Sequence, residues 1–508
     1  MVAVHLSSVF NGLRGLFQGS STPGQLASVP EESTTGFTDA FNPPLNSYRE
    51  SIRSVSIVCS EWRVRSTLSD QSTSTDSSDS GASRSNTSSY SSASVGAADL
   101  GTSELTKIAH RMVSDGYTQR MVRAFHTLSL TETIGPDPAL KNWSIELDVD
   151  WVLDSRLQLR LKRASANWLQ ELVKRWIRAL TIIVSGINEV NLVTRRWRSH
   201  EALAIARFGK ASISAMLIVV GTILDAIEED KLQAVLHMYM CVSIASYMSM
   251  MPVVSLEAQC ILDEISILLK TEENQLIQVI SSTMMDIKML PKYDSWAIDN
   301  IARSGGGIDC KIRFLVNGIL SMRKAYASTL VSAQSQNTVR LRDAIDDTID
   351  YLKDELQRKS DLFQDPSLGC IFLLNNSYFV AQVMSQSHPS GIILTLECKK
   401  YMDFYLLSWG HVLSCIPKYN SPGLLRRWIN TSPLAKFESA FHKTYQTQKF
   451  WKVPDPRLRD ALRRAIIERV ISGYRDYLKE QPELAEQVSR GSSSPEVLEE
   501  MLGELFEG

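Results

Sequence analysis

The sequence predicts an all-α protein whose N-terminal region is disordered and rich in serine. From about Ser103 to Phe506, apolar residues recur at spacings of three and four, which places them on one face of a helix. Strand-like alternation is scarce over the same range. Between Ser66 and Ser94, roughly half of the residues are serine, so this segment cannot bury enough surface to offset the entropy of ordering it.

The N-terminal region also contains one short helical pattern. Leu6, Phe10, Leu13 and Phe17 recur at spacings of four, three and four, which predicts either a frayed tail or a docking peptide for a partner groove or a membrane surface. Helical periodicity becomes continuous only beyond this region. We therefore expect residues 1–104 to be mostly disordered and helical bundles to follow.

The helical part begins with clear amphipathic segments. Leu105, Ile108 and Met112 share one helical face, and a second such pattern runs from Trp168 to Ile183. Later helix starts are marked by Asp365 before Pro366 and by Asp455 before Pro456. In each pair an N-cap acceptor precedes a proline at the first helical position, where the missing N–H costs nothing.

One stretch, from Ala234 to Leu256, carries no formal charge and is long enough to cross a bilayer. It contains His237, several serines and Pro252, and it lies among amphipathic segments. We therefore expect a buried core helix that is rich in methionine, not a membrane span.

The overall composition excludes several classes of protein. The 508 residues are 44% hydrophobic, and the formal net charge is −2, which excludes general electrostatic attraction to nucleic acid. The seven cysteines lie far apart without a CxxC pair, which indicates thiols in a reducing compartment. No secretory signal is recognisable at the N-terminus, so we expect a cytoplasmic protein.

No motif predicts catalysis, a cofactor or a metal. Gly305 to Gly307 follow no predicted strand and precede no GK[ST], so we expect an interhelix turn and not a phosphate-binding loop. The histidines at 388, 411 and 442 lack metal-ligand spacing, and no GxSxG is present. Asn375 and Asn376, inside an apolar helix, are expected to satisfy buried backbone or helix contacts. The sequence therefore favours a protein that is not an enzyme.

Basic residues concentrate on one predicted helix, between Arg457 and Lys479. Asp460, Arg464 and Glu468 form i,i+4 pairs, so one interpretation is a solvated helix face. The other is a surface for an anionic lipid or an acidic partner, because each basic residue near an acidic leaflet contributes about 1 kcal/mol. Smaller basic clusters occur at Arg156 to Arg163 and at Arg195 to Arg198.

Four blocks of sequence resemble the Exo-seventy subunit family of the exocyst vesicle-tethering complex, most closely its plant branch. Ile108–Phe125 (IAHRMVSDGYTQRMVRAF) resembles the family's opening pattern, and Lys359–Gln382 its proline-started helix with paired asparagines. Trp409–Ile416 (WGHVLSCI) and Phe437–Leu478, which contains VPDPRLRDALRRAIIERVISGYRDYL, resemble its C-terminal blocks. Together these blocks indicate similarity from about Thr106 to Gly508.

The resemblance implies an elongated rod of consecutive antiparallel helical bundles, which we divide at 105–290, 291–420 and 421–508. It implies a cytoplasmic scaffold without a cofactor, located peripherally at the plasma membrane, with other exocyst subunits or regulatory proteins as partners. It also implies weak binding to an anionic phosphoinositide membrane surface. The residues assigned to this contact are Arg459, Arg463, Arg464 and Lys479.

Two features separate the sequence from the family pattern and leave two functions open. Few residues before Thr106 can form the long coiled-coil region by which members bundle with other subunits. Ser489–Pro495 (SRGSSSP) stands where plant relatives often carry a basic and aromatic block, and glutamates follow it. The first function is vesicle tethering in exocytosis. The alternative is a divergent adaptor in plant immunity or trafficking that no longer assembles into the exocyst.

Overall fold

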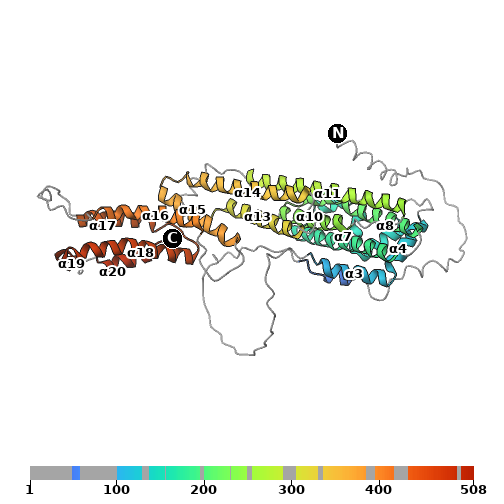
Figure 1. Ribbon diagram of the computed structural model, residues 1–508, viewed down its shortest axis with the longest axis horizontal. Coiled ribbons are helices and arrows are strands. Elements are labelled where there is room, and N and C mark those ends of the chain that lie inside the picture. Colours follow the sequence, from blue (N-terminus) through green and yellow to red (C-terminus); the bar gives the residue numbers. More distant parts are fainter. Residues whose placement is uncertain are drawn as a thin grey trace, which may run out of the picture. The chain divides into compact units, whose positions relative to one another are not determined.

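The computed structural model describes residues 48–57, 100–128, 137–154, 156–194, 199–228, 230–248, 255–289, 305–329, 336–384, 395–416, 433–488 and 493–507. Within these ranges the regular structure is helical, apart from one isolated antiparallel bridge between Lys452 and Glu507 (Figure 1). The predicted all-α fold class is therefore confirmed. The Ser66–Ser94 segment, the Leu6–Phe17 pattern and the cluster at Arg195–Arg198 lie outside the described residues.

The helices are labelled in chain order in Figure 1. Their bounds are α2 Tyr48–Ser54, α3 Thr102–Ser114, α4 Tyr117–Leu128, α5 Pro138–Glu146, the 3₁₀ helix η2 Asp150–Leu153, α6 Leu157–Leu161, α7 Ala166–Thr194, α8 Ser199–Ile218, α9 Val220–Ala226, α10 Lys231–Met248, α11 Leu256–Met289, α13 Cys310–Thr329, α14 Gln336–Ser360, α15 Pro366–Met384, α16 Leu396–Ser414, α17 Pro433–Gln448, α18 Pro456–Lys479, α19 Pro482–Val488 and α20 Pro495–Gly503.

The chain divides into two compact units, and helices α11, α13 and α14 each contribute residues to both. The described residues of the first unit fall within 48–57, 100–283 and 321–342, and those of the second within 284–320 and 343–507. The three-bundle division at 105–290, 291–420 and 421–508 stays a prediction.

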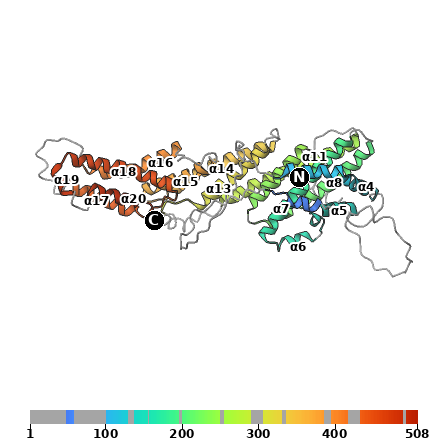
Figure 2. The ribbon, with the colours of Figure 1, turned by 90° about the horizontal axis from the view of Figure 1, so that it is seen from below.

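Helix α7, labelled in Figure 1 and Figure 2, packs against α3, α8 and α10 in the first unit. Its middle turns are completely buried, because Trp176 and Leu180 have no exposed surface. The Trp176 indole Nε1 donates a hydrogen bond of 2.8 Å to the carbonyl oxygen of Met216, which ties α7 to α8. This bond satisfies the polar atom of a large apolar side chain inside the core.

Helix α10 confirms the expectation of a buried, methionine-rich segment over its described residues. Most of its side chains are buried, including those of His237, Met238 and Tyr239. Two other stretches, Glu201–Ala226 and Pro366–Met384, are long and apolar enough to cross a membrane, with 61% and 50% of their most apolar windows buried. A core helix of a soluble protein satisfies the same criterion, so this composition is weak evidence for a membrane span.

The structure adds one helix that the sequence did not predict. Residues 48–57, expected to be part of a mostly disordered region, contain α2 and bury Tyr48, Ile52, Val55 and Ile57. The spacing of these residues is helical only over seven positions, which is too short for a periodic pattern to stand out. The element therefore depends on its contacts with the rest of the first unit.

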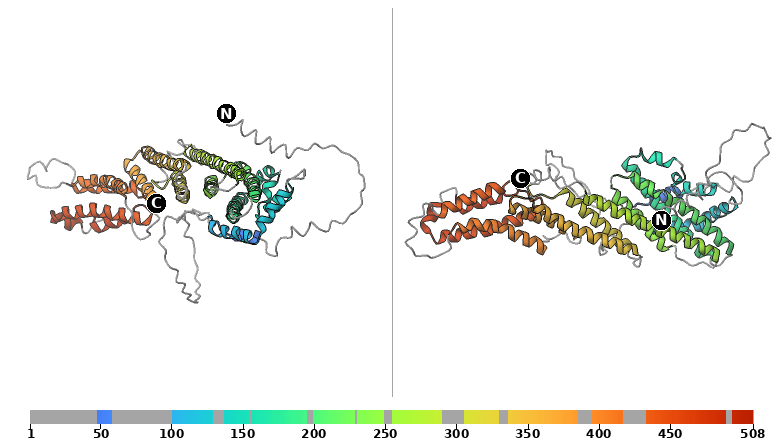
Figure 3. Two further views of the ribbon diagram at one scale, coloured as in Figure 1. Left: turned by 45° about the vertical axis from the view of Figure 1, so that its right-hand side comes forward. Right: turned by 90° about the horizontal axis from the view of Figure 1, so that it is seen from above.

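In the second unit, α16 packs against α15, α17 and α18, and α18 packs against α20 (Figure 3). The core is aromatic, with Trp409, Phe437, Phe441 and Tyr474 fully buried. The rings of Phe437 and Tyr474 stack at 4.5 Å between centroids, which joins α17 to α18. This packing fixes which face of α18 is turned toward solvent.

The predicted interhelix turn and paired asparagines meet in the second unit. Gly305 and Gly306 have φ of 61° and 81°, in the left-handed region that glycine adopts without strain. Asn375 Nδ2 donates to the carbonyl oxygens of Gly306 (2.7 Å) and Lys452 (2.8 Å). The expected role of Asn375 and Asn376 is confirmed, since Asn376 Nδ2 likewise donates to the Gly307 carbonyl at 3.2 Å.

Candidate functional site

Helix α18 carries the four basic residues that the sequence assigned to lipid binding. Asp455 begins the helix, because its Oδ1 accepts from Leu458 N at 2.9 Å and Pro456 follows at the first helical position. The predicted cap is therefore confirmed. Leu458, Leu462 and Ile466 form a buried stripe, so the basic residues lie on the remaining faces of the helix.

The structure groups three of these residues and separates the fourth. Arg459, Arg463 and Arg464 lie within two turns at the start of α18. Lys479 lies 15 positions beyond Arg464, a distance of about 22 Å at the helical rise per residue. A single lipid headgroup therefore cannot contact Lys479 and the arginine group together.

Two members of the set are exposed and available to a ligand. Arg464 is exposed, and its Nε contacts the Asp460 carbonyl oxygen in its own helix at 3.3 Å. The Lys479 side chain is 76% exposed and forms an ion pair with Asp476 at 3.1 Å. Such exposed pairs contribute little and open readily. Arg459 is half-buried and has no ion pair with any residue the structure describes.

Arg463 has a structural role that the sequence did not indicate. Its Nε and Nη2 donate to the Leu505 carbonyl oxygen at 2.8 and 2.5 Å, and Nη2 also contacts Glu507 Oε1 at 3.1 Å. Only 15% of the side chain is exposed. The guanidinium therefore holds the C-terminal residues against α18, and no local pattern around Arg463 could have revealed a partner so distant in sequence.

The acidic residues after Ser489–Pro495 contact part of the basic surface. Arg475 Nη2 lies 2.9 Å from Glu499 Oε2 and 3.5 Å from Glu496 Oε1, both on α20. These carboxylates neutralise Arg475 and lower the positive potential beside Lys479. The positive surface of α18 is therefore strongest at its first turns.

An exposed aromatic residue lies just before that end of the helix. Phe450 is 67% exposed, and Lys449 Nζ lies 4.8 Å from its ring centroid. The next residue, Trp451, points inward and is 6% exposed, while Lys452 is exposed. Aromatic and basic side chains together suit a membrane interface or a protein partner. The sequence pattern marks only the helix start at Asp455–Pro456 and does not single out Phe450.

The cluster at Arg156–Arg163 forms a second basic surface, in the first unit. Arg156, Arg160, Lys162 and Arg163 are all exposed on or beside the short helix α6. Leu159 is exposed among them (66%), and Arg160 pairs with Asp154 at 3.1 Å. The combination of four cations with an exposed leucine makes this surface the second candidate for an anionic membrane.

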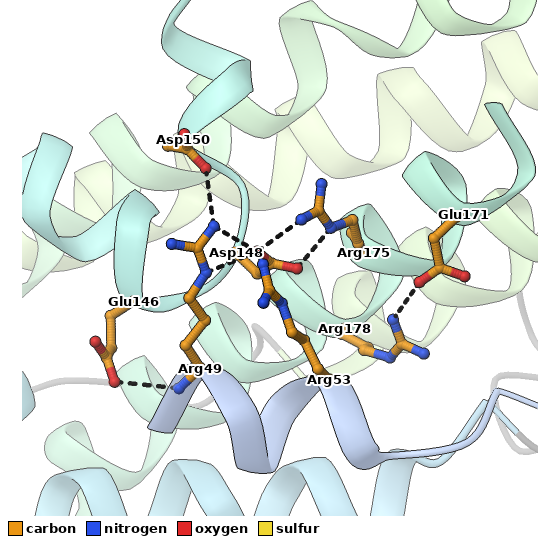
Figure 4. A network of polar contacts seen from close by, with 8 residues as sticks. All are labelled: Arg49, Arg53, Glu146, Asp148, Asp150, Glu171, Arg175 and Arg178. Carbon is orange, nitrogen blue, oxygen red and sulfur yellow. Dashed lines mark hydrogen bonds and ion pairs between the residues drawn. The ribbon is translucent and has the colours of Figure 1, made fainter. Parts of the chain in front are cut away.

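A third polar site is buried in the first unit, around Asp148 (Figure 4). Arg53 Nη2 donates to Asp148 Oδ1 at 2.6 Å, and Arg49 Nε does so at 2.8 Å. Arg175 on α7 donates to both carboxylate oxygens, at 2.5 and 2.8 Å. Burial alone would raise the pKa of this carboxyl, but the bonds from Arg53, Arg175 and Arg49 outweigh it and lower the pKa to about 2.

Comparison with known proteins places the chain in a family. A family model for the C-terminal part of the Exo70 exocyst complex subunit matches residues 174–504, more than half of the sequence. The chain belongs to the Exo70 family. The resemblance drawn from the sequence blocks is thus confirmed, and the Exo70 match contains all of α18, whereas α2 and Asp148 lie outside it.

Named relatives are plant Exo70 proteins. EXO70A3 of Arabidopsis thaliana is 29% identical over 178 residues, which cover 31% of this chain and 30% of that protein. EXO70C1 of the same plant is 28% identical over 196 residues, which cover 35% of this chain and 28% of that protein. The chain thus matches less than a third of the length of either relative. A solved structure of Exo70 from S. cerevisiae has a TM-score of 0.42 and 14% identity, over 80% of this chain and 86% of that chain.

Proposed function

We propose that this Exo70-family chain is a non-enzymatic scaffold that helps tether secretory vesicles to the plasma membrane as an exocyst-type subunit. The family match over residues 174–504 is the observation that carries this proposal. In it, the chain works in the cytoplasm and contacts the membrane peripherally. Its partners are other members of the exocyst, the complex after which the matching family is described.

The membrane contact in this proposal is weak and depends on salt. Arg459 and Arg464 lie close together on α18, with Lys449 and Phe450 in the turn that precedes the helix. Exposed charges separated by more than the Debye length, about 8 Å at physiological ionic strength, barely interact, so only a compact cluster can bind a headgroup. Lys479 is too far away to contact the same headgroup as Arg459 and Arg464. It contributes only to the general electrostatic attraction to an anionic surface.

Affinity purification from the native cell tests the scaffold role. The tagged full-length chain should recover other exocyst subunits in proportion to one another. Recovery of none of them, with a different set of proteins instead, would contradict the tethering role and favour the adaptor function. A matched bait carrying Arg464→Glu distinguishes recovery through protein contacts from recovery through shared membranes, because only the latter should fall.

Liposome co-sedimentation across a salt series tests the lipid contact. Vesicles with bisphosphorylated inositol lipid should bind the chain, and Arg459→Glu with Arg464→Glu should abolish that binding. Arg463 is left unchanged, because its reversal would release the C-terminal residues and confuse misfolding with lost affinity. The matched control is Arg475→Gln, which removes a positive charge already neutralised by Glu499 without setting a carboxylate against it. Binding unaffected by the double reversal would exclude α18 and direct attention to Arg156–Arg163.

A further inference from the structure

Residues 48–57 form a short segment that packs against the other helices of the first unit. Helix α2 contacts α3 and α5; Ile52 on the helix and Val55 and Ile57 just beyond its end are buried. The Tyr48 ring lies 5.7 Å from that of Tyr117 on α4. One face of α2 is therefore an apolar anchor of the kind that helical peptides insert into grooves.

Polar groups of the same groove contact both ends of the segment. Glu146, at the end of α5, accepts from the backbone N–H groups of Tyr48 and Arg49, which begin α2. At the other end, Arg178 Nε donates to the Val55 carbonyl oxygen at 3.0 Å. The exposed backbone groups of a short helix are thus satisfied by the groove and not by the segment itself.

Charge provides the specificity of the contact. Arg49 and Arg53 lie four positions apart on α2 and both bind the carboxylate of Asp148, whose side chain is 2% exposed (Figure 4). Arg175, from the groove, binds the same carboxylate, so the carboxylate has a cationic partner besides the two arginines of α2. A ligand for this site must therefore present two arginines at i and i+4 beside an apolar face.

The backbone at Asp148 fixes the position of its carboxylate at the end of α5. Asp148 follows α5 in the left-handed conformation, with φ of 61°, and Val149 N donates to Ser144 O at 2.8 Å, closing a Schellman motif. Glycine is the usual residue at this position, because a side chain there is strained. The aspartate held at this position presents its carboxylate to the arginines of α2 and α7.

We propose that this groove, formed by α3, α5 and α7, is a peptide-binding site and that residues 48–57 are its exchangeable intramolecular ligand. A helix of seven residues is not stable in water alone, so α2 forms only when it is bound. Binding and helix formation of the segment are then a single local equilibrium. A partner helix with two arginines at i and i+4 beside an apolar face competes for the same groove. This inference does not depend on the proposed tethering role.

Hydrogen exchange on the unaltered full-length chain is the first test. Amides of residues 52–55 should exchange at least about tenfold faster than those of residues 177–180 in α7, because the segment opens without unfolding the unit. Asp148→Asn, which keeps a residue that tolerates the left-handed backbone, should accelerate the exchange of 52–55 more than that of 177–180, whose helix loses only the bond from Arg175. Equal exchange of both regions in the unaltered chain would overturn the proposal.

Binding in trans is the second test. A fluorescent synthetic peptide of residues 46–58 should bind a full-length chain carrying Arg49→Ala and Arg53→Ala, whose own segment is weakened. Its affinity should fall about tenfold or more when the groove also carries Asp148→Asn, because both arginines of the peptide then lose their one anionic acceptor. A peptide with Glu50→Ala, at an exposed position, is the matched control and should bind unchanged. No binding to the weakened chain, or binding indifferent to Asp148, would overturn the proposal.

Discussion

The guanidinium of Arg463 donates two hydrogen bonds to the carbonyl oxygen of Leu505, which lies 42 residues further along the chain. This contact makes the C-terminal residues part of the second unit, since Leu505 and Phe506 are themselves buried in its core. A basic residue of α18 that could have bound a membrane therefore stabilises the fold instead.

Replacing Arg463 should accordingly destabilise the protein. Arg463→Gln leaves the Leu505 carbonyl without its charged donor, and hydrogen bonds to charged groups contribute about 1.5–3 kcal/mol. We expect a lower melting temperature by calorimetry and faster proteolysis of the last residues. The matched control is Arg464→Gln, one position away and exposed, which should leave both measurements unchanged. Equal melting temperatures for Arg463→Gln and the unaltered chain would contradict the structural role.

Removing the cap of α18 should have a smaller effect. Asp455→Ala deletes the acceptor for Leu458 N and should lower the free energy of unfolding by about 1 kcal/mol. Asp455→Ser keeps a capping oxygen and should recover most of the loss. Denaturant unfolding measures both variants. If Asp455→Ser were as destabilised as Asp455→Ala, the capping hydrogen bond could not be the cause.

Local signals explain what the sequence could predict. The caps at Asp365 and Asp455 are predictable because a side-chain acceptor directly before proline indicates the start of a helix. In the structure, Asp365 Oδ1 accepts from Ser367 N at 2.8 Å. The same signal begins α5 at Asp137–Pro138 and α20 at Ser494–Pro495. The start of each of these helices is therefore predictable from residues within one turn of it.

Contacts between distant residues explain what the sequence could not predict. The inward turn of Arg463 depends on Leu505, and helix α2 depends on Asp148, almost a hundred positions away from Arg49. The charges of Arg459, Arg463 and Arg464 are equivalent in the sequence, although packing leaves only 15% of the Arg463 side chain exposed. Only the folded chain decides which cations face solvent, because that depends on which elements pack beside the helix.

Substituting the first glycine of the interhelix turn separates two sources of strain. Gly305→Ala would force a side chain into the left-handed region and place its Cβ 3.0 Å from the Phe450 carbonyl oxygen. Gly116→Ala is the matched control, since Gly116 has a φ of 71° and a Cβ added there would meet no atom within 4 Å. The control should cost about 1–2 kcal/mol from backbone strain alone, and Gly305→Ala should cost more. Denaturant unfolding would contradict the steric argument if both losses were equal.

His237 on α10 should make the first unit sensitive to acid. Burial lowers the pKa of its imidazole to about 4, and the positive charges of Lys174 and Lys324 act in the same direction. In the unfolded chain this histidine has its ordinary pKa of 6.5. Between pH 6.5 and 4 the unfolded chain is therefore protonated at His237, whereas the folded chain is not. Stability is complete above this window and falls as the pH drops through it.

The size of this effect follows from the shift in pKa. Full titration across the window corresponds to a loss on the order of 3 kcal/mol in the free energy of unfolding. His237→Gln cannot take up a proton, so its stability relative to the unaltered chain should improve as the pH falls from 7 to 4. Lys174→Met removes one of the charges that oppose protonation and should move the lower end of the window upward. Denaturant unfolding at half-unit pH steps measures all three chains, and parallel pH profiles for His237→Gln and the unaltered chain would show that another group controls the acid response.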